Sequence, residues 1–195
     1  PLVRLARLSG DKGAEVCGKL ESSNIAGSVK DRPALSMILA AEAAGQLNAG
    51  STVVEATSGN TGISLAMICA VRGYRCVIVM PEDMSIARRH LLQAYGAEVV
   101  LCEPTLEARD RETARVIERT GATLVHPYDD PRIIAGQATA AKELLEDAGE
   151  LDLLLAPVGR REDRPADVRQ DQPQPHRTGR AAPQPRPVRR QIRHE

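Results

Sequence analysis

The chain has 195 residues, with 26 Lys and Arg residues and 26 Asp and Glu residues, so its formal net charge is zero. This balance excludes any argument from total charge for a nucleic-acid or membrane partner. The length allows one domain or two small ones. No run is apolar enough for a membrane span or a signal peptide, so we expect a soluble, cytoplasmic protein. The first residue is Pro1 rather than methionine, which predicts a fragment or a processed product.

The cysteines bear on the redox environment. There are four of them: Cys17, Cys69, Cys76 and Cys102. Their spacing is not that of a metal site, and three of the four lie within apolar runs. We therefore expect buried thiols in a reducing compartment, without disulfides and without a bound metal.

The first 45 residues predict two short strands and one helix. The strands are expected at residues 2–5 and 16–20. Apolar residues then recur at helical spacing from Pro33, which fits the first turn of a helix, and Gly45 ends this pattern. Lys30 therefore lies at the start of a helix. Taken alone, such a lysine is usually a solvated surface charge.

Residues 55–62, with the sequence E-A-T-S-G-N-T-G, stand between an apolar strand at 52–54 and a helical pattern. A turn of this kind leaves backbone N–H groups unpaired at the positive end of the helix dipole. Side-chain donors join them at Thr57, Ser58, Asn60 and Thr61. The turn predicts a cradle for a small anion, a carboxylate or a phosphate. The alternative is a helix N-cap with a tight turn and no ligand.

Strands and helices alternate along the rest of the chain. This pattern predicts an α/β fold with parallel twisted sheets, flanking helices and right-handed crossovers, and with ligands beyond the carboxyl ends of the strands. Neither a G-x-G-x-x-G motif nor a P-loop is present. After the helix that ends near Gly73, strands are expected at 75–80, 98–102, 122–126 and 152–156, and helices at 86–95, 106–120 and 133–148. Ser85 is suited to cap the first of these helices.

The composition changes after Gly159. Residues 160–195 hold six prolines and ten arginines against five acidic residues, with only three large aliphatic side chains. Such a segment buries too little apolar surface to offset the entropy of ordering, so we predict disorder. The alternative is a basic arm for nucleic acid or an acidic partner, which the absence of aromatic residues and repeats disfavours.

Two motifs together resemble a known family. Residues 28–32, S-V-K-D-R, followed by 57–62, T-S-G-N-T-G, resemble the fold type II pyridoxal-phosphate (PLP) enzymes of the tryptophan synthase beta-like family, and most closely the cysteine synthase branch. Residues 1–5, 80–85 and 95–97 are similar to further segments of that family. The resemblance covers residues 1–159. It implies a small domain at about 35–148, together with the starting strands of a larger, truncated second domain.

The resemblance implies roles for individual residues. Lys30 would be the lysine that forms an imine with PLP, the implied cofactor, and would take the proton from the substrate Cα. Asn60 would bond the phenolic oxygen of the cofactor. The α-carboxylate of a small amino-acid substrate would be held by Thr57, Ser58, Asn60 and Thr61. The intact family implies a homodimer, and neither a nucleic acid nor a membrane is implied as a partner.

The implied reaction is β-replacement on an activated serine, in which O-acetylserine and sulfide give cysteine. One departure from the cysteine synthases is Pro127, where they usually carry glutamine. Residues 126–131, followed by Ala135, Gly136, Gln137 and Thr139, look more like the threonine dehydratase and serine racemase branch. The alternative reaction is therefore β-elimination or racemisation.

A second departure follows Gly159. The family continues there with a glycine-rich loop that grips the cofactor phosphate, whereas residues 160–163 here read R-R-E-D. Charged side chains cannot replace glycines where backbone N–H groups must approach a phosphate closely. We therefore suspect a shifted reading frame in residues 160–195. We expect this chain to bind PLP weakly and to be impaired or inactive; a further alternative is an inactive remnant that binds only an anion or a partner.

Overall fold

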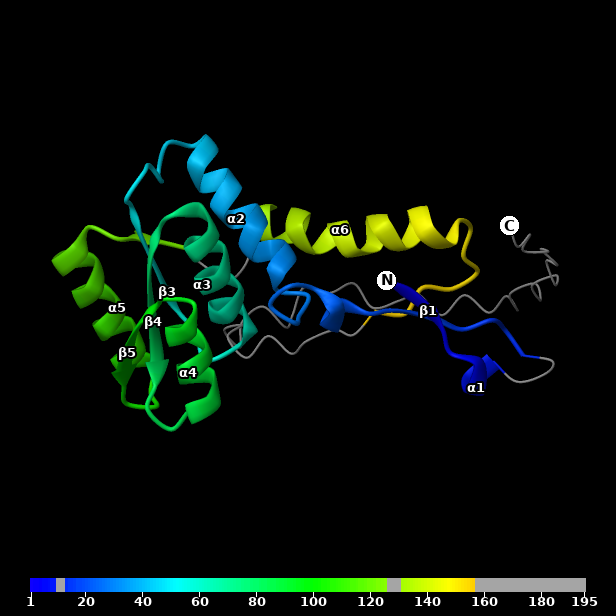
Figure 1. Ribbon diagram of the computed structural model, residues 1–195, viewed down its shortest axis with the longest axis horizontal. Helices are drawn as coiled ribbons and strands as arrows, with labels where there is room; N and C mark the ends of the chain where they lie inside the picture. The colour runs from blue at the N-terminus through cyan, green and yellow to red at the C-terminus, as the bar shows by residue number, and fades with distance from the viewer. Residues whose placement is uncertain (10–12, 126–130, 157–195) are drawn as a thin grey trace, which may run out of the picture. The chain divides into compact units, whose positions relative to one another are not determined.

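The computed structural model describes residues 1–9, 13–125 and 131–156 (Figure 1). The chain divides into two compact units, Pro1–Leu153 and Leu154–Glu195. The fold below is that of the first unit. The predictions of disorder and of a shifted reading frame for residues 160–195 lie outside the described residues and stay predictions.

The N-terminal segment forms a two-stranded antiparallel sheet. Strand β1 (Leu2–Arg4) pairs with β2 (Cys17–Lys19), so that Leu2 lies opposite Lys19. A short helix, α1 (Ala6–Ser9), follows β1, and a 3-10 helix, η1 (Glu21–Ser23), follows β2. Both predicted strands are confirmed, each slightly shorter than expected.

The rest of the unit is an α/β layer structure with a four-stranded parallel sheet in the order β5-β4-β3-β6. The predicted fold class, with parallel strands and flanking helices, is confirmed. The strands are β3 (Thr52–Ala56), β4 (Arg75–Pro81), β5 (Glu98–Cys102) and β6 (Thr123–Leu124). The helices are α2 (Asp31–Ala43), α3 (Asn60–Arg72), α4 (Ile86–Ala94), α5 (Leu106–Thr120) and α6 (Pro131–Ala148).

Two apolar clusters cover the two faces of this sheet. Successive side chains of a strand point to opposite faces. Val53 accordingly packs in the larger cluster, with residues of α2 and α3, while Val54 packs in the smaller cluster with Val116 of α5. Figure 1 shows α5 on the side of the sheet away from α3. Strands β3 and β4 are therefore buried on both faces, as their continuous apolar sequences predict.

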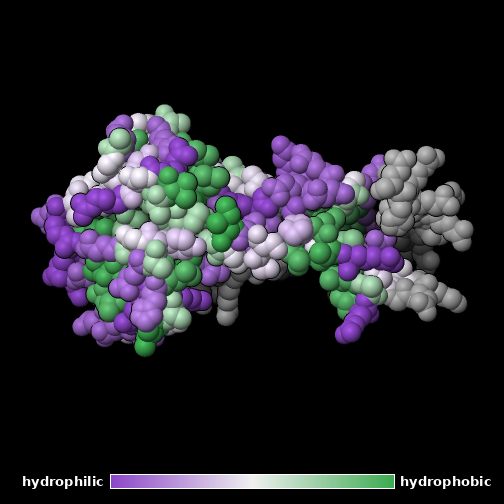
Figure 2. Space-filling model, viewed as in Figure 1, coloured by the Kyte–Doolittle hydropathy of each residue, from purple (hydrophilic) through white to green (hydrophobic). Residues whose placement is uncertain are grey.

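Part of the apolar surface remains exposed. Large aliphatic side chains such as Ile25, Val71 and Ile134 are exposed. Figure 2 shows green surface among purple on the α/β layers. In the part of the chain that the structure describes, no helix combines the length and the apolar character needed to cross a bilayer.

Three of the four cysteines are buried, as expected, and Cys17 is not. All four carry free thiols; Cys69, Cys76 and Cys102 are buried, and Cys17 is exposed. A hydrogen bond with Cys69, together with burial, raises the pKa of the Cys76 thiol. Burial also raises the pKa of Cys102. Because the thiolate is the reactive form, these buried thiols are expected to be inert.

One local prediction holds only in part, and another is wrong. Ser85 precedes α4 as predicted, but its side chain makes no cap hydrogen bond; its backbone carbonyl accepts the N–H groups of Arg88 and Arg89 instead. Residues 152–156 do not form a strand. Their leucines are exposed, and no strand among the described residues pairs with them. An apolar run predicts burial, but a strand also needs a partner for its backbone groups.

Candidate active site

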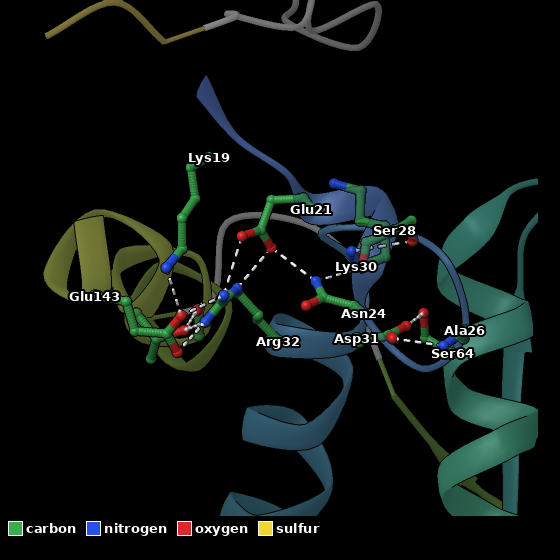
Figure 3. Close-up of polar contacts among 12 residues, drawn as sticks. Lys19, Glu21, Asn24, Ala26, Ser28, Lys30, Asp31, Arg32, Ser64 and Glu143 are labelled. Carbon is green, nitrogen blue, oxygen red and sulfur yellow. Dashed lines mark hydrogen bonds and ion pairs between the residues drawn. The ribbon is translucent and has the colours of Figure 1, made fainter. Parts of the chain in front are cut away.

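Lys30 lies at the N-terminus of α2, as predicted, and is half-buried. Hydrogen bonds fix the backbone before it: the Asn24 amide donates to the Ser28 carbonyl oxygen at 3.0 Å, and the Lys30 N–H donates to the Ser28 hydroxyl at 3.2 Å (Figure 3). Within the described residues, no hydrogen bond or ion pair involves the Nζ of Lys30. Its amine is therefore not committed to a structural ion pair there.

The predicted anion turn lies between β3 and α3, at the carboxyl end of a central strand. The Thr57 N–H donates to the Val79 carbonyl oxygen at 3.0 Å, and the Thr57 hydroxyl accepts the Gly59 N–H at 3.2 Å. Helix α3 begins at Asn60, within this turn. The Arg88 guanidinium of α4 donates to the Ser58 carbonyl oxygen at 3.0 Å and supports the turn from outside.

The structure brings the four predicted turn residues together in this one bend. Among the described residues, the side chains of Ser58, Asn60 and Thr61 make no hydrogen bond. Their donors, and the first N–H groups of α3, are available to a ligand. A primary amine at Lys30, an amide at Asn60 and hydroxyl donors together fit an aldehyde cofactor with a carboxylate substrate.

One hydrogen bond joins the two halves of the site. The Asp31 carboxylate accepts the Ala26 N–H at 2.7 Å and the Ser64 hydroxyl at 2.5 Å. Ser64 is buried in α3, and its oxygen lies 3.0 Å from the Asn60 carbonyl oxygen. The loop before Lys30 is thus connected to the first turn of α3 (Figure 3).

A buried carboxyl group in β3 was missed by sequence reasoning. Glu55 is completely buried, and within the described residues neither of its carboxyl oxygens has a hydrogen-bond partner. Burial raises the pKa of Glu55 to about 8, although the positive charges of Arg109 and Lys30 oppose the shift. The carboxyl group is therefore mostly neutral at pH 7. An acidic residue in the apolar strand V-V-E-A was the available signal.

An ion-pair cluster lies next to the site and was also missed. The Arg32 guanidinium contacts Glu21 at 2.6 Å and Glu143 of α6 at 2.7 Å. Lys19 contacts Glu143 at 3.1 Å and Asp147 at 3.0 Å. Arg32, with Lys19, lowers the pKa of Glu143 to about 2. Arg32 and Glu143 are 111 positions apart in the sequence, so no local pattern predicts the cluster.

We expect Gly62→Ala to distort the anion turn. A Cβ at this position would lie 2.6 Å from the Cγ2 of Thr57 and 3.4 Å from Ile78. Turning Thr57 away would break its hydrogen bond with Gly59, so the free energy of unfolding should fall by about 1–3 kcal/mol. Urea unfolding measures it. Gly59→Ala is the control in the same turn, because its Cβ would meet nothing within 4 Å; equal losses in both variants would contradict the prediction.

Fold and site together define an α/β protein with a lysine at the start of α2 and a turn with unpaired side-chain donors at the carboxyl end of β3, as far as the described residues show. Residues 1–161 match the family described as pyridoxal-phosphate dependent enzyme. The chain belongs to this family, whose cofactor is PLP, and the resemblance stated from its motifs is confirmed.

Similar proteins lie in several branches of the family. Cysteine synthase B of Salmonella typhimurium is 51% identical over 134 residues, which cover 67% of this chain and 44% of that protein. The crystal structure of O-ureido-L-serine synthase is 42% identical with a TM-score of 0.71, covering 77% of this chain and 49% of that one. Serine racemase from Dictyostelium discoideum is 35% identical with a TM-score of 0.70, covering 78% and 48%. The chain thus spans about half the length of these relatives.

Proposed function

We propose that the site holds PLP through Lys30 and Asn60 and binds the α-carboxylate of an amino acid at Thr57, Ser58, Asn60 and Thr61. The observation that carries the proposal is the set of unpaired donors in the described residues: the Lys30 amine and the turn side chains. When bound, PLP supplies an electron sink for the bond broken at Cα. A cytoplasmic location and a homodimeric assembly belong to the same proposal.

The reaction that we propose is β-replacement: O-acetylserine and sulfide give cysteine and acetate. Lys30 takes the Cα proton at its Nζ, and the turn between β3 and α3 holds the carboxylate so that this proton faces the amine. The cysteine synthase B relatives, 44–55% identical to this chain, support this reaction.

A second candidate is β-elimination or racemisation of serine or threonine. It starts from the same loss of the Cα proton. Its support is the likeness to serine racemase and to a threonine deaminase, which is 38% identical with a TM-score of 0.67. The residues that suggested this branch include 126–130, which lie outside the described part of the chain. Product analysis with O-acetylserine, with and without sulfide, separates the two reactions.

We expect reduction with borohydride to trap PLP on Lys30. Because residues 160–163 carry no glycine, affinity should be low, and trapping over a range of PLP concentrations is the suitable measure. Mass spectrometry of peptides should place the adduct at Lys30, and Lys30→Ala should lose it. Lys142→Ala removes an exposed amine of α6 and is the control. No adduct, or an adduct retained in Lys30→Ala, would overturn the proposal; binding of an amino acid without PLP would favour the inactive remnant.

A further inference from the structure

The two halves of the site come from separate segments, and one side chain connects them. Within the described residues, the hydrogen bond between Asp31 and Ser64 is the only one that joins residues 24–31 to residues 57–64. The other contacts between α2 and α3 are apolar packing and an ion pair between Glu42 and Arg72, which lies in the last turns of the two helices, away from Lys30 and Asn60. Packing is less directional than a hydrogen bond, so it orients the two segments less strictly.

The geometry of Asp31 suits a connecting role. Its two carboxylate oxygens accept from different segments, the Ala26 N–H at 2.7 Å and the Ser64 hydroxyl at 2.5 Å. Both distances are short, as expected for hydrogen bonds to a charged acceptor. Ser64 is fully buried, so water does not compete for its hydroxyl.

We propose that Asp31 is a positioning residue, whose carboxylate holds the loop that carries Lys30 against the first turn of α3. This inference rests on the proposed function, because it concerns the two halves of the same site. Asp31 acts through its two hydrogen-bond partners. Its bond to the Ala26 N–H fixes the loop before Lys30, and its bond to Ser64 ties that loop to the turn of α3 that begins at Asn60. Together they fix the position of Lys30 relative to the carboxylate-binding turn. The stability of α2 does not require the hydrogen bond to Ser64, so this bond distinguishes a positioning role from a purely structural one.

The simpler role for Asp31 is that of an acidic residue in the first turn of α2, where it stabilises the helix dipole. That role needs the charge of Asp31 but no contact with α3. Ser64→Ala separates the two roles, because it removes the hydrogen bond and leaves the charge. Ser36→Ala is the matched control: it deletes a serine hydrogen bond of α2, to the Arg132 carbonyl oxygen, away from α3.

Amide hydrogen exchange tests the connection without any cofactor. In Ser64→Ala, amides of residues 24–31 should exchange several-fold faster than in the parent chain, although the substitution lies in another helix. Ser36→Ala should leave their exchange unchanged. Equal exchange of residues 24–31 in the parent chain and Ser64→Ala overturns the proposal, whether or not PLP binds.

Trapping of PLP tests the effect on the site. The PLP concentration for half-maximal adduct at Lys30 should rise roughly tenfold in Asp31→Ala and Ser64→Ala, the effect of losing a charge-assisted hydrogen bond. Asp31→Asn should recover most of the affinity, because its amide can accept from Ala26 and donate to Ser64. The proposal is overturned if the affinity for PLP depends only on the charge of residue 31. In that case Asp31→Asn and Asp31→Ala lose the same affinity, and Ser64→Ala keeps the affinity of the parent chain. Absence of any adduct in the parent chain overturns the proposed function, and the exchange rates then decide whether Asp31 connects the two segments.

Discussion

Gly136→Ala is expected to destabilise the protein by about 2–3 kcal/mol, because α2 and α6 touch at this glycine. A Cβ there would lie 2.6 Å from the Cα of Pro33 and 2.9 Å from the Arg32 carbonyl oxygen. Both of these neighbours are backbone atoms of α2, which cannot rotate away. The helices would have to separate, and the contact between Arg32 and Glu143 would loosen with them.

The sign of the stability change in Gly136→Ala shows whether α2 and α6 are in close contact at this position. In an open helix interior, replacing glycine with alanine stabilises by up to about 1 kcal/mol. Urea unfolding at pH 7 would show which effect dominates. Gly18→Ala is the control, because its Cβ would meet Leu5 at 3.6 Å or more, an ordinary contact distance. A Gly136→Ala variant at least as stable as the parent would mean that α6 does not pack on α2 in this way.

Glu55→Gln is expected to remove a large pH-dependent loss of stability. The unfolded carboxyl group titrates near 4.5 and the folded one near 8. Between these values the folded chain binds the proton and the unfolded chain does not, so raising the pH favours unfolding by up to about 1.4 kcal/mol per pH unit. Below pH 4.5 and above pH 8 this contribution is constant. A buried glutamine keeps its shape but does not titrate.

Urea unfolding at pH 5, 6.5 and 8 measures the effect. The stability of Glu55→Gln relative to the parent chain should increase with pH across this window, since all other titrating groups are shared. Glu118→Gln, at an exposed position of α5, is the control and should show no such trend. Parallel stability curves for the parent and Glu55→Gln would show that Glu55 is not held neutral in the folded protein.

Local patterns predicted most of this fold, because each element depends on short-range features. Helix α5 lies at residues 106–120 as its sequence predicts, with the Thr105 side chain accepting the Ala108 N–H at one end and Gly121 in the left-handed conformation at the other. The turn at residues 57–61 was recognisable because small polar residues follow a strand and precede a helix. The predicted strand at residues 152–156 was wrong because an apolar pattern does not show whether a partner strand is available.

The missed parts of the site depend on distant residues. The partners of Arg32 lie on η1 and α6, and the partner of Asp31 lies on α3. The motif at residues 28–32 identifies Asp31 and Arg32 as members of a functional group of residues, but it does not show which side chains they contact. Glu55 is a different case. The sequence shows an acidic residue within an apolar strand, but only the three-dimensional packing shows that its carboxyl group has no hydrogen-bond partner among the described residues.

The strand order β5-β4-β3-β6 has a consequence for where chemistry can occur. From β3 the chain first moves outward through β4 to β5, and it then crosses beneath the sheet along α5 to reach the opposite neighbour, β6. The direction of the strand order therefore reverses at β3, and in open α/β sheets ligands bind beyond the carboxyl ends of the strands at such a reversal. Thr57 and its neighbours directly follow β3, so the connectivity of the strands by itself puts them at the position where sheets of this kind bind ligands.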